Sequence, residues 1–276
     1  MANPIGFMQG RLSPLVDGKI QAFPWDNWRS EFPAAQQIGL RMMEWTLDQD
    51  RLYQNPLLTP QGQQEIRELC ARHDMSVPSL TGDCFMQAPF WKAQAQAGLQ
   101  ADFLAIARAC HAVGIDMVVV PLVDNGGLTS RAEEDCVVAF LLEHAGLFAE
   151  LSLRIIFECD FSPKELARFI ARLPGDGFGI NYDIGNSAAL GFDPVEEFAA
   201  YGERVLNVHV KDRVLGGTTV PLGTGNADLP KVFDLLHRQN YRGNYIMQTA
   251  RARDQRHAEV LARYRDMIEK WIADAA

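Results

Sequence analysis

Three apolar runs in the second half of the chain each lead into a side chain that can bind a metal ion. Residues 155–157 lead into Glu158, residues 180–182 into Asp183, and residues 206–208 into His209. A fourth run, residues 244–247, leads into Gln248. Two carboxylates, an imidazole and an amide oxygen form a mixed donor set that suits Mn²⁺, Mg²⁺, Co²⁺ or Zn²⁺. We therefore expect these four residues to hold one divalent metal ion.

These runs are four of eight β-like segments that alternate with longer stretches of helical period. Most are continuously apolar, which is typical of parallel strands that are buried on both faces. Amphipathic helices are expected over 99–113, 133–151 and 255–273, with another beginning at Pro163 after Ser162. The predicted strands are 5–9, 42–45, 76–80, 117–122, 154–158, 179–183, 206–210 and 245–248.

Eight βα units in 276 residues predict a (β/α)₈ TIM barrel that forms a single domain over residues 1–276. The alternative, a doubly wound sheet, is disfavoured because no GxGxxG motif opens a first βα turn. In a barrel the carboxyl ends of all strands face one mouth, so Glu158, Asp183, His209 and Gln248 would converge there.

Composition narrows the classes of partner and the location. The net charge of −9 and a pI near 5.2 oppose binding to nucleic acid, which depends on clustered Lys and Arg. The chain shows neither a signal-peptide pattern at its start nor a membrane-length apolar run, so we expect a cytoplasmic protein without a membrane partner. Five scattered cysteines without a CxxC motif argue against a disulfide framework and a structural zinc site.

Four motifs carry a resemblance over nearly the whole chain. They are Phe157-Glu158, the segment Tyr-Asp-Ile-Gly-Asn at 182–186, Asn-Val-His-Val-Lys-Asp at 207–212, and Pro-Leu-Gly-Thr-Gly-Asn-Ala-Asp at 221–228. With them the chain resembles the sugar phosphate isomerase and epimerase superfamily of xylose isomerase-like TIM barrels, which includes ketose 3-epimerases and hydroxypyruvate isomerase. Relatives bind one divalent metal through Glu, Asp, His and Glu, and use the two glutamates as acid and base. The resemblance carries the metal-binding role to Glu158, Asp183 and His209.

Two positions depart from the pattern of that superfamily. Gln248 stands where the second catalytic glutamate is expected; its oxygen can ligate a metal, but it cannot accept a proton as a base. Asn186 stands where relatives often carry a substrate-binding histidine, and it can still bind a hydroxyl group. We therefore expect Glu158 to be the principal catalytic base.

A metal that chelates neighbouring carbonyl and hydroxyl oxygens stabilises an enediolate, so Glu158 alone could shuttle a proton between two carbons. Epimerisation needs an acid on the opposite face, for which Lys211, Glu44 and Asp83 are candidates near predicted strand ends. We assign Lys211 as the second catalytic residue, and expect Glu44 and Asp83 to contact the substrate. The alternative for Lys211 is a structural ion pair with Asp212 or Glu158.

Arginines follow three strands that are neighbours in a closed barrel: Arg11 after the first, Arg213 after the seventh, and Arg251 after the eighth. Guanidinium groups match phosphate and carboxylate oxygens, so we expect an anionic sugar, above all a sugar phosphate. Aromatic residues in the loops after strands one and three suit sugar stacking or a homo-oligomer contact equally well.

The sequence therefore predicts a metal-dependent isomerase or epimerase of a sugar phosphate or a related ketose or keto acid. A dehydratase is an alternative, because the same enediolate can expel a β-hydroxyl group. A catalytically weakened sugar-binding or regulatory protein is another, since the chain lacks the second glutamate.

Overall fold

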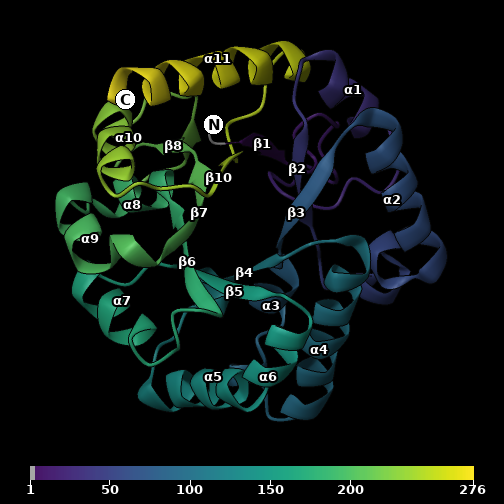
Figure 1. Cartoon of the computed structure of the whole chain (residues 1–276), viewed down its shortest axis with the longest axis vertical. Coiled ribbons are helices and arrows are strands. Elements are labelled where there is room, and N and C mark those ends of the chain that lie inside the picture. Colours follow the sequence, from purple (N-terminus) through teal and green to yellow (C-terminus); the bar gives the residue numbers. More distant parts are fainter. Residues whose placement is uncertain (1–3) are drawn as a thin grey trace.

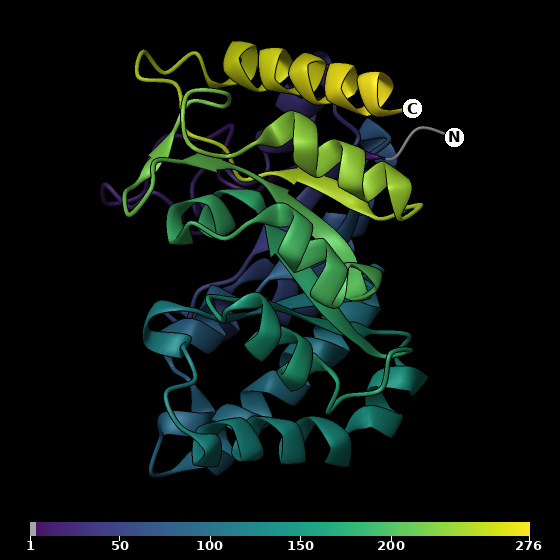
Figure 2. The ribbon, with the colours of Figure 1, turned by 90° about the vertical axis from the view of Figure 1, so that its left-hand side faces the viewer.

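The computed structural model describes residues 4–276, and its centre is a closed barrel of parallel strands. Around the ring the strands follow the order β1-β10-β7-β6-β5-β4-β3-β2. Figure 1 shows the strands inside a ring of helices, and α11 lies beside α10 in both views (Figures 1 and 2). The barrel strands are β1 (Ile5–Met8), β2 (Met42–Thr46), β3 (Ser76–Thr81), β4 (Met117–Leu122), β5 (Arg154–Cys159), β6 (Phe178–Asp183), β7 (Val205–Val210) and β10 (Asn244–Met247).

The architecture confirms the predicted TIM barrel, and each barrel strand begins and ends within one residue of its prediction. The helices are α1 (Glu31–Gln37), α2 (Pro60–His73), α3 (Asp83–Gln87), α4 (Gln96–Val113), α5 (Arg131–Glu143), α6 (Ala145–Glu150), α7 (Pro163–Ile170), α8 (Ile184–Leu190), α9 (Pro194–Tyr201), α10 (Leu229–Arg238) and α11 (His257–Ala275). Short 3₁₀ turns lie at Leu52–Gln54, Pro56–Leu58, Phe90–Lys92, Asp124–Gly126 and Gly202–Arg204.

Two local features differ from the prediction. The helix expected over 133–151 is divided at His144, which ends α5 and begins α6. A short antiparallel hairpin, β8 (Asp212–Arg213) with β9 (Thr219–Val220), follows β7 and was not predicted. Its strands have only two residues each, too few for a periodic pattern to appear in the sequence.

Alternation within each strand separates the side chains that pack toward the helices from those that point into the barrel. In β5, Ile155 and Phe157 join the large core between strands and helices, whereas Ile156 belongs to a small separate cluster with Met117 and Val119. In β7, Val208 and Val210 pack into the same large core. Their neighbours Asn207 and His209 therefore point to the opposite side, into the barrel.

The capping chemistry at the start of α7 follows the prediction. Ser162 and Glu165 form a capping box, and Pro163 occupies the first turn of the helix. Among the described residues, no helix combines the length and apolar character needed to cross a membrane.

Candidate active site at the carboxyl end of the barrel

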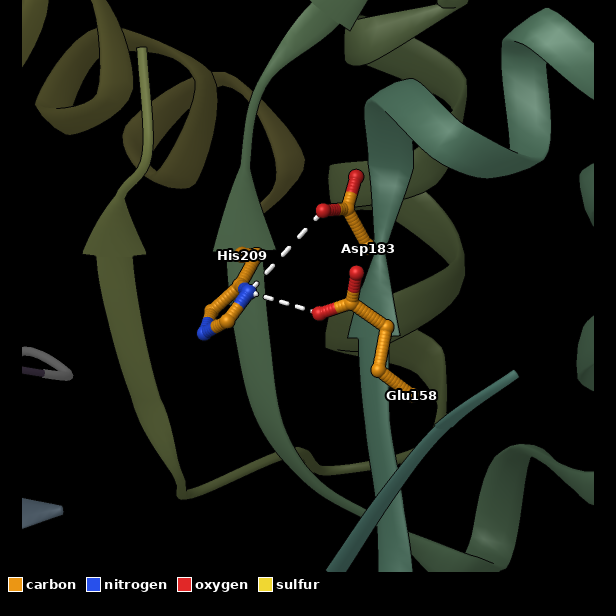
Figure 3. A group of neighbouring side chains, drawn as sticks. All are labelled: Glu158, Asp183 and His209. Atoms are coloured by element: carbon orange, nitrogen blue, oxygen red, sulfur yellow. Dashed lines mark ion pairs between the residues drawn. The ribbon is translucent and has the colours of Figure 1, made fainter. Parts of the chain in front are cut away.

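The carboxyl ends of β5, β6 and β7 bring together Glu158, Asp183 and His209. One potential ligand atom from each of these residues lies within 4.8 Å of the others, and all three residues are buried. His209 Nδ1 lies 3.0 Å from Glu158 Oε2 and 3.9 Å from Asp183 Oδ2, and Figure 3 shows both carboxylates directed toward this nitrogen. The three predicted ligands thus converge from strands that are neighbours in the barrel.

A hydrogen bond on the far side of the imidazole fixes the orientation of His209. Its Nε2 lies 2.7 Å from Glu44 Oε1, and both side chains are fully buried. Glu44 also accepts hydrogen bonds from Ser79 (2.7 Å), Thr81 (2.5 Å) and Asn207 (3.1 Å). With Nε2 bonded to this carboxylate, Nδ1 is the nitrogen that faces Glu158 and Asp183.

Burial opposes a charge on His209, but Glu44 and Glu158 outweigh that effect and raise the pKa of His209 to about 10. Burial likewise opposes ionisation of Glu158, but the cationic partners His209 and Lys211 lower its pKa overall. For Asp183 burial prevails, and its pKa is raised although Lys211 opposes the change. The ionised forms of the buried carboxyl groups of Glu158 and Asp183 are therefore stabilised by nearby positive charge, which opposes the effect of burial.

Two asparagines hold the Glu158 carboxylate. Asn181 donates to Oε2 at 3.0 Å, and Asn186 donates to Oε1 at 2.6 Å. Asn186 is a predicted substrate-binding residue, and its side chain is shared between Glu158 and Arg213, whose NH1 donates to Oδ1 at 2.8 Å. Asn181 was not predicted; the available signal was its place two residues before Asp183, on the same face of the strand.

Asp183 offers the clearest test of whether these residues suit a metal. Its Oδ1 accepts the backbone N–H of Asn186 at 2.8 Å, which begins α8. Within residues 4–276 its Oδ2 is buried and accepts no hydrogen bond, although it forms an ion pair of 2.6 Å with Lys211 Nζ. Two buried carboxylates and an imidazole nitrogen, with Asp183 Oδ2 already paired to a cationic group, form a donor set that fits a divalent cation.

Gln248, the fourth predicted ligand, lies beside Lys211. Its Oε1 accepts a hydrogen bond from Lys211 Nζ at 2.7 Å, and its Nε2 donates to Gln21 Oε1 at 2.9 Å. The oxygen that we expected to face a metal is thus engaged with the ammonium group. Lys211 therefore bridges Gln248 and Asp183. The structural alternative predicted an ion pair of Lys211 with Asp212 or Glu158, but its ion-pair partner is Asp183.

Asp212 does not pair with Lys211 but holds the backbone of the segment that follows the β8–β9 hairpin. Its carboxylate accepts backbone N–H groups from Gly223 (2.9 Å), Gly225 (2.8 Å) and Ala227 (3.1 Å). A Cβ on Gly225 would lie 2.2 Å from Asp212 Oδ1, so glycine is required at this position. The motifs at 207–212 and 221–228 therefore form one structural unit beside Lys211.

A cavity of about 520 Å³ opens at this end of the barrel. The lining polar residues that matter for chemistry are Gln21, Asp83, Glu158, Asn186, Lys211, Arg213 and Gln248. Asp83 Oδ2 accepts a hydrogen bond of 2.7 Å from Gln21 Nε2. Gln21 was not predicted, because nothing in a loop sequence indicates which strand ends it will reach.

Three of the predicted substrate-binding residues do not line this cavity. Glu44 is fully buried beneath it, in the contacts described above. Arg11 is 3% exposed, and its NH1 donates to the backbone oxygen of Ile20 at 3.1 Å. Arg251 lines a separate cavity and donates to the backbone oxygen of Ser13 at 2.5 Å. Both arginines therefore support the first loop, and Arg213 is the predicted arginine that reaches the cavity.

Comparison with known proteins gives the family. The family model described as a xylose isomerase-like TIM barrel matches residues 32–272. A putative L-ribulose-5-phosphate 3-epimerase, SgbU, of Escherichia coli (strain K12) is 33% identical over 78 residues. These are 26% of this chain and 27% of that protein, so the similarity spans about a quarter of the relative's length.

Solved structures share the fold over almost the whole chain. A xylose isomerase-like TIM barrel protein from Mycobacterium smegmatis in complex with magnesium has a TM-score of 0.75 at 16% identity, covering 99% of this chain and 97% of that one. D-allulose 3-epimerase from Methylomonas sp. in complex with D-allulose has a TM-score of 0.74 at 15% identity, covering 98% of each chain. With a closed eight-stranded barrel and a family match over most of its length, the chain belongs to the xylose isomerase-like TIM barrel family.

Proposed function

We propose that the protein is a divalent-metal-dependent isomerase or epimerase that acts on a sugar phosphate or a related ketose or keto acid. The observation that carries the proposal is the convergence of Glu158, Asp183 and His209, of which Glu158 lines a polar cavity. Support comes from the magnesium complex and the D-allulose complex among proteins of the same fold.

In the proposed mechanism Glu158, Asp183 and His209 would hold the metal, which when bound would supply Lewis-acid chemistry for a substrate with adjacent carbonyl and hydroxyl oxygens. Glu158 takes the proton from the carbon between those oxygens and returns it to the same or the neighbouring carbon. Asn181 and Asn186 hold the carboxylate in place through bonds to both of its oxygens. Because Asn186 bonds Oε1, a shift of Asn186 toward a substrate hydroxyl would free that oxygen for the proton.

Lys211 is the proposed partner of Glu158. Its Nζ lines the cavity between Asp183 Oδ2 and Gln248 Oε1, so it can donate a proton or hydrogen bond to a substrate oxygen that gains negative charge. Gln248 holds the ammonium group at this point, and it remains a proposed fourth ligand through the same oxygen. Glu44 suits a positioning role for His209 better than contact with a sugar, because it is fully buried.

Arg213 is the proposed contact for an anionic group on the substrate. It lines the cavity, and its NH1 is bonded to Asn186, which in turn contacts Glu158. Its Nε donates to the backbone oxygen of Gly217 at 3.0 Å, so the guanidinium group is oriented by the β8–β9 hairpin. An ordered guanidinium group at the rim favours a phosphate or carboxylate at one end of the sugar.

Product analysis tests the proposal and separates it from the dehydratase and binding-protein alternatives. The protein is incubated with Mn²⁺ and either L-ribulose 5-phosphate or D-allulose, and the products are identified by NMR. An isomer or epimer supports the proposal, and a product that has lost water supports a dehydratase. Binding of either sugar without turnover would support a sugar-binding protein and contradict the proposal.

A further inference from the structure

The cavity contains a third carboxyl group, that of Asp83, which neither the metal cluster nor the proposed roles of Glu158 and Lys211 use. Asp83 follows β3 and lines the same cavity as Glu158, Lys211 and Gln248. It is 6% exposed, so its carboxyl is nearly withdrawn from bulk water while it still faces the cavity. A buried carboxyl in an active-site cavity is suited to proton transfer.

The order of strands places Asp83 outside the three neighbouring strands that carry the metal cluster. Glu158, Asp183 and His209 follow the consecutive strands β5, β6 and β7. Gln248 follows β10, Gln21 lies in the loop after β1, and Asp83 follows β3. In the ring β3 is separated from β5 by β4 alone and lies on the side of β5 that is away from β6 and β7. Asp83 therefore approaches the cavity from a different direction than Asp183 and His209, and Gln21 connects it to Gln248 on the far side of the mouth.

A chain of hydrogen bonds connects Asp83 to Gln248, the position at which a second catalytic carboxylate was expected. Gln248 Nε2 donates to Gln21 Oε1 at 2.9 Å, and Gln21 Nε2 donates to Asp83 Oδ2 at 2.7 Å. The position of Gln248, where the family pattern has a carboxylate, is therefore connected to the Asp83 carboxyl group through two hydrogen bonds. No hydrogen bond to the other oxygen, Oδ1, occurs within residues 4–276, which leaves it available to a substrate.

The other two candidates for an acid on the opposite face are less suitable. Glu44 is fully buried and occupied by His209, Ser79, Thr81 and Asn207. Lys211 Nζ is already engaged by Asp183 Oδ2 within the metal cluster and by Gln248 Oε1.

We infer that Asp83 is the second proton-transfer group of this site, and that the reaction is therefore an epimerisation at the carbon beside the ketose carbonyl. The inference rests on the proposed function. Glu158 removes the proton from one face of that carbon, and the C–H electrons enter the enediolate. The carboxylic acid of Asp83 then gives its proton to the opposite face, which re-forms the C–H bond with inverted configuration. Glu158 is left protonated and Asp83 ionised, and exchange with water restores both.

The charge environment of Asp83 supports this role. Burial raises the pKa of Asp83 to about 7, with contributions from the negative charges of Asp48 and Glu158. The hydrogen bond from Gln21 and the positive charge of Arg11 oppose that increase. Near neutral pH, Asp83 is then present both as the carboxylic acid, which gives a proton, and as the carboxylate, which takes one in the reverse reaction.

The test compares inversion with proton exchange in wild-type protein and in Asp83→Asn. Each protein is loaded with Mn²⁺ and incubated in D₂O with L-ribulose 5-phosphate or D-allulose, and NMR measures epimer formation and deuterium at the carbon beside the carbonyl. Asp83→Asn is expected to lose inversion by about 100-fold or more, while exchange with retained configuration, driven by Glu158, persists. A purely structural role of Asp83 would lower both quantities together and would overturn the inference.

Two further variants make the result specific. Asp26→Asn changes an exposed carboxyl in the same first loop as Gln21 and should keep the wild-type ratio of inversion to exchange. Gln21→Met keeps the Asp83 carboxyl but removes its hydrogen bond, and should lower the ratio even if Asp83→Asn does not fold. A wild-type ratio in both cavity variants would overturn the inference.

Measurements on the wild-type protein distinguish failure of the Asp83 role from failure of the proposed isomerase or epimerase activity. Exchange without any inversion would contradict the role of Asp83 and leave the proposed isomerase intact. Absence of exchange with both ketoses would contradict the proposed function, and the inference with it.

Discussion

Lys211 Nζ lies 2.6 Å from Asp183 Oδ2, the same oxygen that completes the cluster with Glu158 and His209. A protein ammonium group thus occupies the edge of a site whose other members suit a divalent cation. A bound cation and the ammonium group would share one carboxylate, so Lys211 is expected to weaken metal binding although it is also the proposed partner of Glu158.

Replacing Lys211 by methionine should separate these two effects. We expect Lys211→Met to bind Mn²⁺ more tightly, by about fivefold or more, because repulsion between nearby charges of about 1 kcal/mol or more is removed. Proton exchange into the ketose should fall about 100-fold or more if Lys211 stabilises the enediolate oxygen. Calorimetric titration with Mn²⁺ measures the first effect, and NMR in D₂O the second. Lys270→Met, at an exposed position of α11, is the control, and weaker metal binding by Lys211→Met would contradict this account.

The contact between Glu44 and His209 predicts a metal-binding defect at a residue that does not reach the cavity. Glu44→Gln keeps the shape of the side chain but removes the charge that orients His209 through Nε2. Affinity for Mn²⁺ should fall about 10–100-fold, the usual effect of removing a partner of a metal ligand. Calorimetry again provides the measurement. Glu65→Gln, which alters a partly exposed ion pair with Arg29, should leave the affinity unchanged, and an equal loss in both variants would refute the positioning role.

The position of Arg213 in the cavity predicts that the protein binds phosphorylated sugars in preference to neutral ones. Arg213→Met should raise the KM for L-ribulose 5-phosphate about tenfold or more, because a charge-assisted hydrogen bond to phosphate is lost. The KM for D-allulose, which carries no phosphate, should change less. Steady-state kinetics with both sugars decide the matter, with Arg263→Met on α11 as an exposed control. Equal changes for the two sugars would argue against an anion contact at Arg213.

Asp83 predicts a particular pH dependence of stability. Its folded-state pKa of about 7 lies above the ordinary aspartate value of 3.8, so the native state binds the proton more tightly than the unfolded state. The stabilisation from this proton is complete below about pH 4 and is lost as the pH rises through about 7. Relative to Asp83→Asn, the wild-type free energy of unfolding should therefore fall between these pH values, by at most about 1.4 kcal/mol per pH unit.

Urea unfolding at pH 5, 6 and 7 measures this difference. The charged groups Asp48, Glu158 and Arg11 are present in both proteins, so their own titration largely cancels in the comparison. Parallel stability curves for wild type and Asp83→Asn would contradict a raised pKa at Asp83.

The barrel and the convergence of Glu158, Asp183 and His209 were predictable because each depends on local sequence and one rule of topology. Apolar runs defined the strands, and the convergence of strand ends at one mouth brought Glu158, Asp183 and His209 together. Glu44 shows the limit of this reasoning. It lies near the end of β2, yet β2 continues to Thr46 and its pairing with β3 is irregular between Met42 and Glu44, so the side chain lies under the cavity.

Loop residues could not be placed by the same rule. Arg11 and Arg251 follow strands at the mouth, as predicted, but both turn to backbone oxygens of the first loop. Gln21 reaches both Gln248 and Asp83 from that loop, more than ten residues beyond β1. Such contacts depend on the path of a long loop, which has no periodic signal. The single-domain extent, the cytoplasmic location and a homo-oligomer remain predictions from sequence. The use of loop aromatic residues for sugar stacking or an oligomer contact was wrong for Trp28, Phe85, Phe90 and Trp91, because these side chains are buried in the hydrophobic core.

The central claim is metal-dependent proton transfer by Glu158, and solvent-deuterium exchange tests it most directly. Wild-type protein and Glu158→Gln are each incubated in D₂O with D-allulose or L-ribulose 5-phosphate, with Mn²⁺ and after treatment with a chelator. The account predicts deuterium at the carbon beside the carbonyl only for wild-type protein with Mn²⁺. Exchange that persists in Glu158→Gln or in the chelator-treated protein, or no exchange under any condition, would contradict it.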